Sequence, residues 1–219
     1  LQRLSDRYGL PVLSVHAPVL VFSSFVWGRS PLVKLERSCA LAAELGASTV
    51  VAHPPYAWQR RSAEHFVSHV RTLEARFGLV VAVENMFPVA GARRRDVFAP
   101  HWNPGELDIA HLTLDFSHAG MAGIAATELS TNWGERLSHI HLCDASRATA
   151  GPSLIDEHLV PGHGVQPVAE VLCSFAASSP DGLVVAEINT RACGRDERMR
   201  VARLDETLRV ARRHLPNAP

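Results

Sequence analysis

The sequence predicts an α/β protein built as a parallel barrel, and two observations lead to that prediction. Six short apolar runs each end on a histidine, an aspartate or a glutamate, and segments with helical periodicity separate the runs. In a parallel α/β barrel the strands bring their last inward side chains together at the C-terminal face of the barrel. The six runs end, in order, on His16, His53, Glu84, Asp115, His141 and Glu187.

The segments between these runs have the start and stop signals of helices. The first nine residues are expected to be the end of a helix, with Gly9 as its stop. Ser30 and Pro31 are the expected cap and first residue of a helix that ends before Gly46. A second helix is expected from Ser62 to the residue before Gly78. Further helices are expected over 103–110, 125–137, 167–177 and 195–215.

The alternation of side chains within the apolar runs favours a barrel over an open sheet. Ala82 and Glu84 share one strand face, and Thr113 and Asp115 share another, which leaves the aliphatic residues for the helix-facing side. No glycine-rich dinucleotide or phosphate-loop motif is present. A (β/α)8 TIM barrel has eight strands. We therefore expect residues 1–219 to form a single barrel domain that is N-terminally incomplete, lacking its first two strands in this chain.

The composition excludes several classes of function. The 219 residues are 47% hydrophobic and 20% charged, which is typical of a globular domain. Basic and acidic side chains number 22 each, so nothing in the net charge favours nucleic acid or a membrane surface as a partner. No apolar stretch is long enough to span a bilayer. The four cysteines lack a C-x-x-C spacing, and we expect reduced thiols in a cytoplasmic protein.

The residues that end the strands have the chemistry of a divalent metal site. A buried carboxylate such as Glu84 or Glu187 needs a cation or a hydrogen-bond network. For either glutamate alone, a structural ion pair with arginine or lysine remains an alternative. Together with Asp115 and His141, however, they predict a mixed oxygen and nitrogen site that suits Mn, Mg, Co, Zn or Fe(II).

Other candidate residues lie in the loops and next to the strand ends. The Asp115-x-x-His118 spacing allows both side chains to serve one site, and Asp156-x-His158 can clamp a metal or cap a turn. His16 and His53 are either ligands or packed histidines at strand ends. A basic loop at 93–95 lies where phosphate contacts are often found. The candidate substrate contacts are Arg147, His163 and Trp58.

Taken in order, these motifs resemble the xylose-isomerase-like TIM-barrel superfamily, which includes sugar-phosphate isomerases and epimerases and endonuclease IV. The resemblance covers almost the whole chain. The matching segments are Ser14-Val15-His16-Ala17-Pro18, Val51-Ala52-His53-Pro54, Val83-Glu84-Asn85-Met86, Leu114-Asp115-Phe116-Ser117-His118, His139-Ile140-His141-Leu142-Cys143-Asp144, Asp156-Glu157-His158 with Pro161-Gly162-His163-Gly164, and Ala186-Glu187-Ile188-Asn189.

The isomerase branch of this superfamily implies one divalent metal, with zinc or manganese expected. Its ligands would be Glu84, Asp115, His141 and Glu187, and the two glutamates would also be the catalytic acid and base. The leading hypothesis is therefore a metal-dependent isomerase or epimerase that acts on a small-molecule sugar or sugar phosphate. If Leu1 is a true start, exposed strand edges would favour a homodimer.

The endonuclease IV branch implies a multi-zinc phosphodiesterase with three metal ions, which is the alternative. The nine implied ligands are His16, His53, Glu84, Asp115, His118, His141, Asp156, His158 and Glu187. All nine are of the required type. This chain has acidic Glu157 where the nuclease motif has a basic residue, and its net charge is zero. Both features argue against a DNA ligand.

Overall fold

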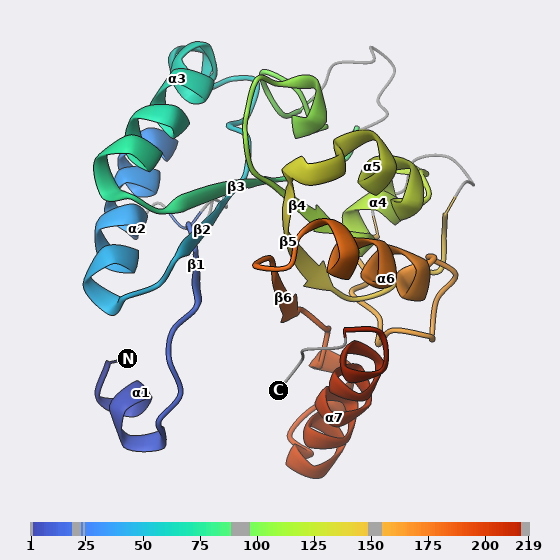
Figure 1. Ribbon diagram of the computed structural model, residues 1–219. Helices are drawn as coiled ribbons and strands as arrows, with labels where there is room; N and C mark the ends of the chain where they lie inside the picture. Colours follow the sequence, from blue (N-terminus) through green and yellow to red (C-terminus); the bar gives the residue numbers. More distant parts are fainter. Residues whose placement is uncertain (1, 19–22, 24, 89–96, 149–154, 216–219) are drawn as a thin grey trace. The chain divides into compact units, whose positions relative to one another are not determined.

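The computed structural model describes residues 2–18, 23, 25–88, 97–148 and 155–215 (Figure 1). The chain divides into two compact units, which we describe separately. The first unit is Leu1–Glu84 with Asp96–Leu112, and the second is Asn85–Arg95 with Thr113–Pro219. The basic loop expected at 93–95 lies outside the described residues. The expectation of one barrel domain over residues 1–219 stays a prediction.

The first unit contains three parallel strands, each flanked by helices. In chain order its elements are α1 (Gln2–Tyr8), β1 (Ser14–His16), α2 (Pro31–Leu45), β2 (Thr49–Ala52), α3 (Arg60–Phe77), β3 (Val80–Glu84) and the short 3₁₀ helix η2 (Pro104–Glu106). β2 pairs with both β1 and β3, so that Val50 lies opposite Val15 and Val81. α2 packs on β1 and β2, and α3 packs on β3 and on α2 (Figure 1).

Local sequence explains both long helices of the first unit. The Ser30 hydroxyl accepts a hydrogen bond from the Val33 amide, and Gly46 ends α2 with a φ of 73°. Along α3, Phe66, Val70 and Leu73 are spaced by four and three residues and form its buried stripe. These stripes cover strands whose own side chains are also buried, since all four residues of β2 are buried.

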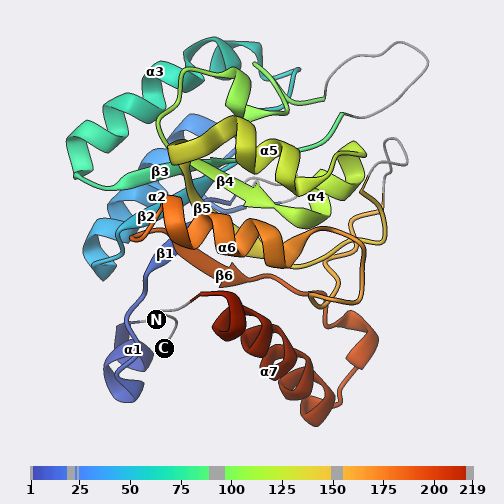
Figure 2. The ribbon, with the colours of Figure 1, turned by 45° about the vertical axis from the view of Figure 1, so that its right-hand side comes forward.

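The second unit alternates strands and helices in the same way. Its elements are β4 (Leu112–Asp115, of which Leu112 belongs to the first unit), α4 (Phe116–Ala122), α5 (Ala126–Trp133), η3 (Gly134–Arg136), β5 (Leu137–Leu142), α6 (Val168–Ser178), β6 (Leu183–Ala186), η4 (Arg191–Cys193) and α7 (Glu197–His214). β5 and β6 are parallel, with His141 opposite Val185. α6 packs against both α5 and α7 (Figure 2).

The structure corrects three helix predictions. The helix expected over 103–110 is only a 3₁₀ turn, because the Asn103 side chain accepts from the Gly105 amide and fixes a turn around Pro104. Helix α3 begins at Arg60, so Ser62 lies inside the helix and is not its cap. α4 was not predicted as a helix. All seven of its residues are buried, and it therefore has no polar face to give an amphipathic pattern.

Other expectations are confirmed in part. Each of the six apolar runs forms a strand, and the helices expected at 125–137, 167–177 and 195–215 appear as α5 with η3, α6 and α7. All four cysteines are free thiols, and three of them are buried. Among the described residues, no helix is both long enough and apolar enough to cross a membrane.

Candidate metal centre

The first unit brings two histidines to one buried glutamate. His16 ends β1, His53 follows β2 and Glu84 ends β3, so parallel pairing of these strands places the three side chains together. The Nε2 atoms of His53 and His16 lie 2.8 Å and 3.2 Å from Oε2 of Glu84. The Nδ1 atom of His16 donates to the carbonyl oxygen of Ala17, at 2.9 Å. Since that nitrogen carries the hydrogen in a neutral His16, Nε2 beside Glu84 is the ring atom that would bind a cation.

The second unit has a larger cluster centred on Asp115 at the end of β4. The Asp115 carboxylate is fully buried, and its Oδ1 atom caps α4 by accepting from the His118 amide at 2.7 Å. Its Oδ2 atom lies 3.2 Å from Nε2 of His158 and 3.7 Å from Nδ1 of His141. Ligand atoms of Asp115, His118 and His158 all lie within 4.8 Å of one another. A single ion can contact groups at this spacing.

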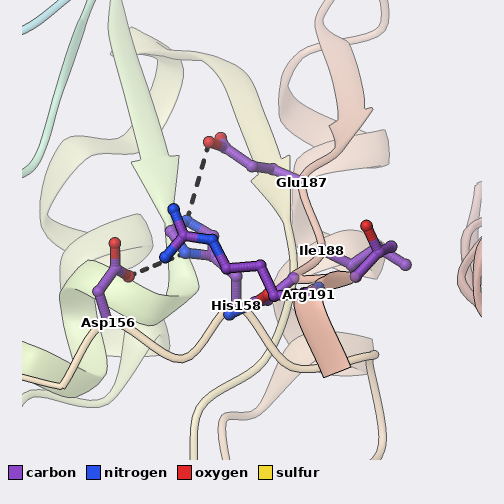
Figure 3. A pocket seen from close by; sticks show the side chains of 7 residues that line it. Asp156, His158, Glu187, Ile188 and Arg191 are labelled. Atoms are coloured by element: carbon purple, nitrogen blue, oxygen red, sulfur yellow. Dashed lines mark hydrogen bonds and ion pairs between the residues drawn. The ribbon is translucent and has the colours of Figure 1, made fainter. Parts of the chain in front are cut away.

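Glu187 joins this cluster from the end of β6. Its Oε2 atom lies 2.8 Å from Nδ1 of His141, a residue of the neighbouring strand β5. The Glu187 side chain is 45% exposed, in contrast to the buried Asp115. Glu187, Asp156 and His158 line a pocket of about 330 Å³, and Figure 3 shows these side chains pointing toward one another across it. The open end of the cluster is therefore where a small ligand can reach it.

Two residues that the sequence analysis did not select hold the cluster in place. Asn85 is fully buried, and its side chain forms hydrogen bonds with both the amide and the carbonyl oxygen of Asp115. The Asn85 carbonyl also accepts from Nδ1 of His118 at 2.9 Å. With Nδ1 donating, Nε2 of a neutral His118, 4.0 Å from Oδ2 of Asp156, is the ring atom that would bind a metal.

Ser117 is the second such residue, and it fixes the loop that carries Asp156 and His158. Its hydroxyl donates to Oδ1 of Asp156 at 2.7 Å and accepts from the amides of Glu157 and His158 at 2.9 Å and 3.1 Å. His158 has a φ of 43°, a conformation that is costly for a residue with a Cβ atom. Such a backbone persists only where its surroundings hold it, and the hydrogen bonds of Ser117 to the amides of Glu157 and His158 do so here.

The charges of the second cluster are strongly coupled. Burial disfavours the charged form of Asp115, but nearby His118, His141 and His158 outweigh burial and hold the pKa of this carboxyl well below its usual range. Burial likewise opposes protonation of His158, but its hydrogen bonds to Asp115 and Asp156 raise the pKa of His158 to about 11. Without a metal, a protonated His158 thus supplies the positive charge that the two carboxylates require.

The donor set fits a divalent metal on structural grounds. Two groups of carboxylate oxygens and imidazole nitrogens each lie within 4.8 Å of one another. One group comes from Asp115, His118 and His158, and the other from His16, His53 and Glu84. Imidazole suits Zn, Cu, Fe and Ni, while carboxylate suits Mg, Ca and Mn, so this mixture fits a first-row divalent ion. A metal at Asp115 would replace the proton on His158 as the neutralising charge.

The three predicted substrate contacts lie in different surroundings. Arg147 is half-buried, and its carbonyl accepts from the Gln166 side chain. His163 pairs with Glu206 of α7 at 2.8 Å and is not among the residues that line the Glu187 pocket. Trp58, in the first unit, is 62% exposed and stacks on Tyr56 at 4.5 Å. Their roles in binding substrate stay predictions.

Comparison with known proteins identifies the family. Residues 1–214 match the family described as xylose isomerase-like TIM barrel. The chain belongs to this family. The match confirms both the predicted fold class and the resemblance stated above. An uncharacterized protein of Mycobacterium tuberculosis is 45% identical to this family member over 234 residues, covering 98% of the present chain and 81% of the relative.

Solved structures of low sequence identity share the fold. A D-tagatose 3-epimerase-like protein is 22% identical with a TM-score of 0.61, covering 95% of this chain and 82% of its own. An IolI protein with a bound zinc atom is 16% identical with a TM-score of 0.66, and the match covers 97% of this chain and 82% of the IolI chain. Endonuclease IV from Thermus thermophilus is 20% identical with a TM-score of 0.54, and the match covers 94% of this chain and 80% of the endonuclease chain.

Metal binding by the second cluster is predicted to release a proton from His158. The metal-free His158 is protonated below about pH 11, and only the neutral ring can bind a metal. The apparent affinity for Zn²⁺ should therefore fall about tenfold for each pH unit lost between pH 8 and 6. Titration calorimetry in buffers of different ionisation enthalpy measures the released protons. A zinc affinity that does not change with pH would contradict the prediction.

The Ser117→Ala variant is predicted to bind metal about 10- to 100-fold more weakly, because the loop that carries Asp156 and His158 loses its anchor. Competition with a chromophoric chelator measures the affinity. Ser178→Ala is the matched control, because its hydroxyl donates within α6, to the carbonyl oxygen of Ser174. Equal zinc affinity in Ser117→Ala and in the control would show that Ser117 does not position the site.

Proposed function

We propose that this protein is a metal-dependent isomerase or epimerase of small sugars or sugar phosphates. The placement of Glu187 is the observation that carries the proposal. Its carboxylate lies 2.8 Å from His141 in the candidate metal cluster and also lines the adjacent pocket. A general base needs this arrangement, because it must lie beside the metal that orients the substrate and must also be reachable by the substrate.

The names of structural neighbours support the same reaction class. The IolI structure contains zinc, and another neighbour is described as D-tagatose 3-epimerase-like. Both share the fold with this chain at low sequence identity. The donor atoms gathered around Asp115 suit zinc or manganese, which are the metals expected for such an enzyme.

In the proposed reaction one glutamate removes a proton from the substrate and the other returns one. A bound metal would polarise the hydroxyl and carbonyl oxygens of an open-chain sugar. Glu187 removes or returns the proton on the carbon next to the carbonyl. Glu84, whose buried carboxylate contacts His16 and His53, is the second acid/base candidate that the family resemblance implies. His141 orients Glu187 through their 2.8 Å contact, and Asn85 fixes the backbone of Asp115.

Replacement of Glu187 by glutamine is predicted to lower turnover about 100- to 10,000-fold, because the amide cannot accept the substrate proton. The change preserves the size of the side chain, and Glu187 is partly exposed, so the fold should be kept. Exchange of the substrate C–H hydrogen with deuterium from solvent, followed by NMR over a panel of sugars and sugar phosphates, measures the step directly.

The control for this experiment is Glu197→Gln, which removes the same charge at an exposed position in the first turn of α7. It should retain the wild-type rate of exchange. Wild-type exchange in Glu187→Gln, with a substrate that the native protein turns over, would eliminate Glu187 as the acid/base group.

A multi-zinc phosphodiesterase is the second candidate, and the additional histidines favour it. His118 and His158 flank Asp156 in the second cluster, and His16 and His53 flank Glu84 in the first. A one-metal isomerase of the type proposed does not require these four histidines. The fold is shared with endonuclease IV from Thermus thermophilus.

Metal content and DNA incision separate the two candidates. The phosphodiesterase predicts about three zinc ions per chain and cleavage of an abasic duplex that is lost in His158→Ala. The isomerase predicts about one divalent ion and no incision. Elemental analysis of protein purified without chelator, combined with an incision assay on a labelled abasic oligonucleotide, distinguishes them.

A further inference from the structure

The pocket beside Glu187 contains an arginine that the proposed proton transfer does not use. Arg191 begins the short helix η4 and lines the same pocket, of about 330 Å³, as Asp156, His158 and Glu187. Figure 3 shows its side chain extending toward these three residues. A volume of this size is at the lower end of the range for small-molecule sites. The arginine is therefore placed where it would meet a ligand bound at the candidate metal cluster.

The guanidinium of Arg191 is not engaged by the neighbouring carboxylates. Asp156 pairs with His158 at 2.9 Å, and Glu187 pairs with His141 at 2.8 Å. Within the part of the chain that the structure describes, the Arg191 guanidinium has no hydrogen bond or ion pair. The backbone amide of Arg191 donates to Oδ1 of Asn189. An arginine beside two acidic groups that are already paired is available to bind an anion.

The backbone around Arg191 is tied to the candidate metal cluster. The Asn189 side chain accepts from the Arg191 amide at 2.9 Å, and the Asn189 amide donates to the carbonyl oxygen of His158 at 2.8 Å. Asn189 therefore links the turn that carries Arg191 to the loop that carries His158. This connection fixes the start of the arginine side chain relative to the metal ligands of the same unit.

From these observations we infer that Arg191 binds an anionic oxygen group, either a phosphate or a carboxylate, on the substrate of this enzyme. The inference rests on the proposed isomerase function and narrows its substrate class from sugars in general to acidic or phosphorylated sugars. The planar guanidinium presents paired N–H donors that match both kinds of oxyanion.

Electrostatics explain why such a residue would set specificity. Asp156 and Glu187 line the pocket, and both repel an anionic substrate. Arg191 supplies the opposite charge on the same wall, so an anion can bind if its charged group contacts the guanidinium. A neutral sugar offers no charge to Arg191 and gains less from binding there.

Anion binding by Arg191→Gln tests the inference. The probes are inorganic phosphate and acetate, titrated by calorimetry into the full chain carrying its metal, with sorbitol as the uncharged comparison. The variant should bind the recognised anion at least about tenfold more weakly, since a charge-assisted hydrogen bond is lost. Sorbitol binding should not change. Arg198→Gln, which removes an exposed arginine of α7 outside the pocket, is the matched control.

The outcomes separate the two anions and can also overturn the inference. Arg191-dependent binding of phosphate supports a sugar phosphate, and Arg191-dependent binding of acetate alone supports a sugar acid. Arg191→Lys keeps the positive charge but lacks the paired N–H donors, and it should bind the anion with intermediate affinity. Anion affinities in Arg191→Gln within about twofold of those in Arg198→Gln, with both variants folded by circular dichroism, would refute the inference.

Steady-state kinetics distinguish failure of this inference from failure of the proposed function. For an acidic or phosphorylated substrate, Arg191→Gln should raise KM about tenfold and leave kcat within about threefold, because Arg191 binds the substrate and transfers no proton. If no sugar in the panel is turned over by the native protein, the isomerase proposal fails while the anion titration still reports on Arg191. If a substrate is turned over with unchanged KM in Arg191→Gln, only the role of Arg191 is refuted.

Discussion

The geometry of the second unit depends on one buried carboxylate, that of Asp115. Its Oδ1 atom caps α4, and its Oδ2 atom faces His158 and His141, while Asn85 holds its backbone on both sides. A charge buried to this extent is tolerated only when it is compensated. The protonated His158 compensates it without a metal, and a divalent ion would do so in its place. Folding of this unit therefore brings the candidate metal ligands together around Asp115.

The two clusters share one arrangement of histidine rings, backbone carbonyls and carboxylates. In each, a backbone carbonyl fixes the orientation of a histidine ring: Ala17 for His16 and Asn85 for His118. The other ring nitrogen, Nε2, lies near a carboxylate in each cluster, that of Glu84 for His16 and that of Asp156 for His118. Because the histidine rings are already oriented, they lose less conformational entropy when a metal binds. The open side of the second cluster, formed by Glu187 and Arg191, leaves room for a substrate.

Much of the fold could be predicted from local patterns. The apolar runs that end on polar residues predicted all six strands, and caps such as Ser30 and Gly46 gave the ends of α2. The errors arose where local signals compete or are missing. Asn103 used its side chain to make a turn in place of a helix, and α4 is buried on every side, so its sequence lacks a helical pattern.

Which groups lie at the strand ends follows from the amino-acid order, because a parallel strand brings its last side chain to a fixed edge. The strand pattern therefore suffices to select Glu84, Asp115 and Glu187 as site candidates. The residues that support and surround them depend on the folded chain. Ser117, Asn85 and Arg191 act through contacts with residues far away in the chain or through a shared pocket, and spacing along the sequence carries no record of such contacts.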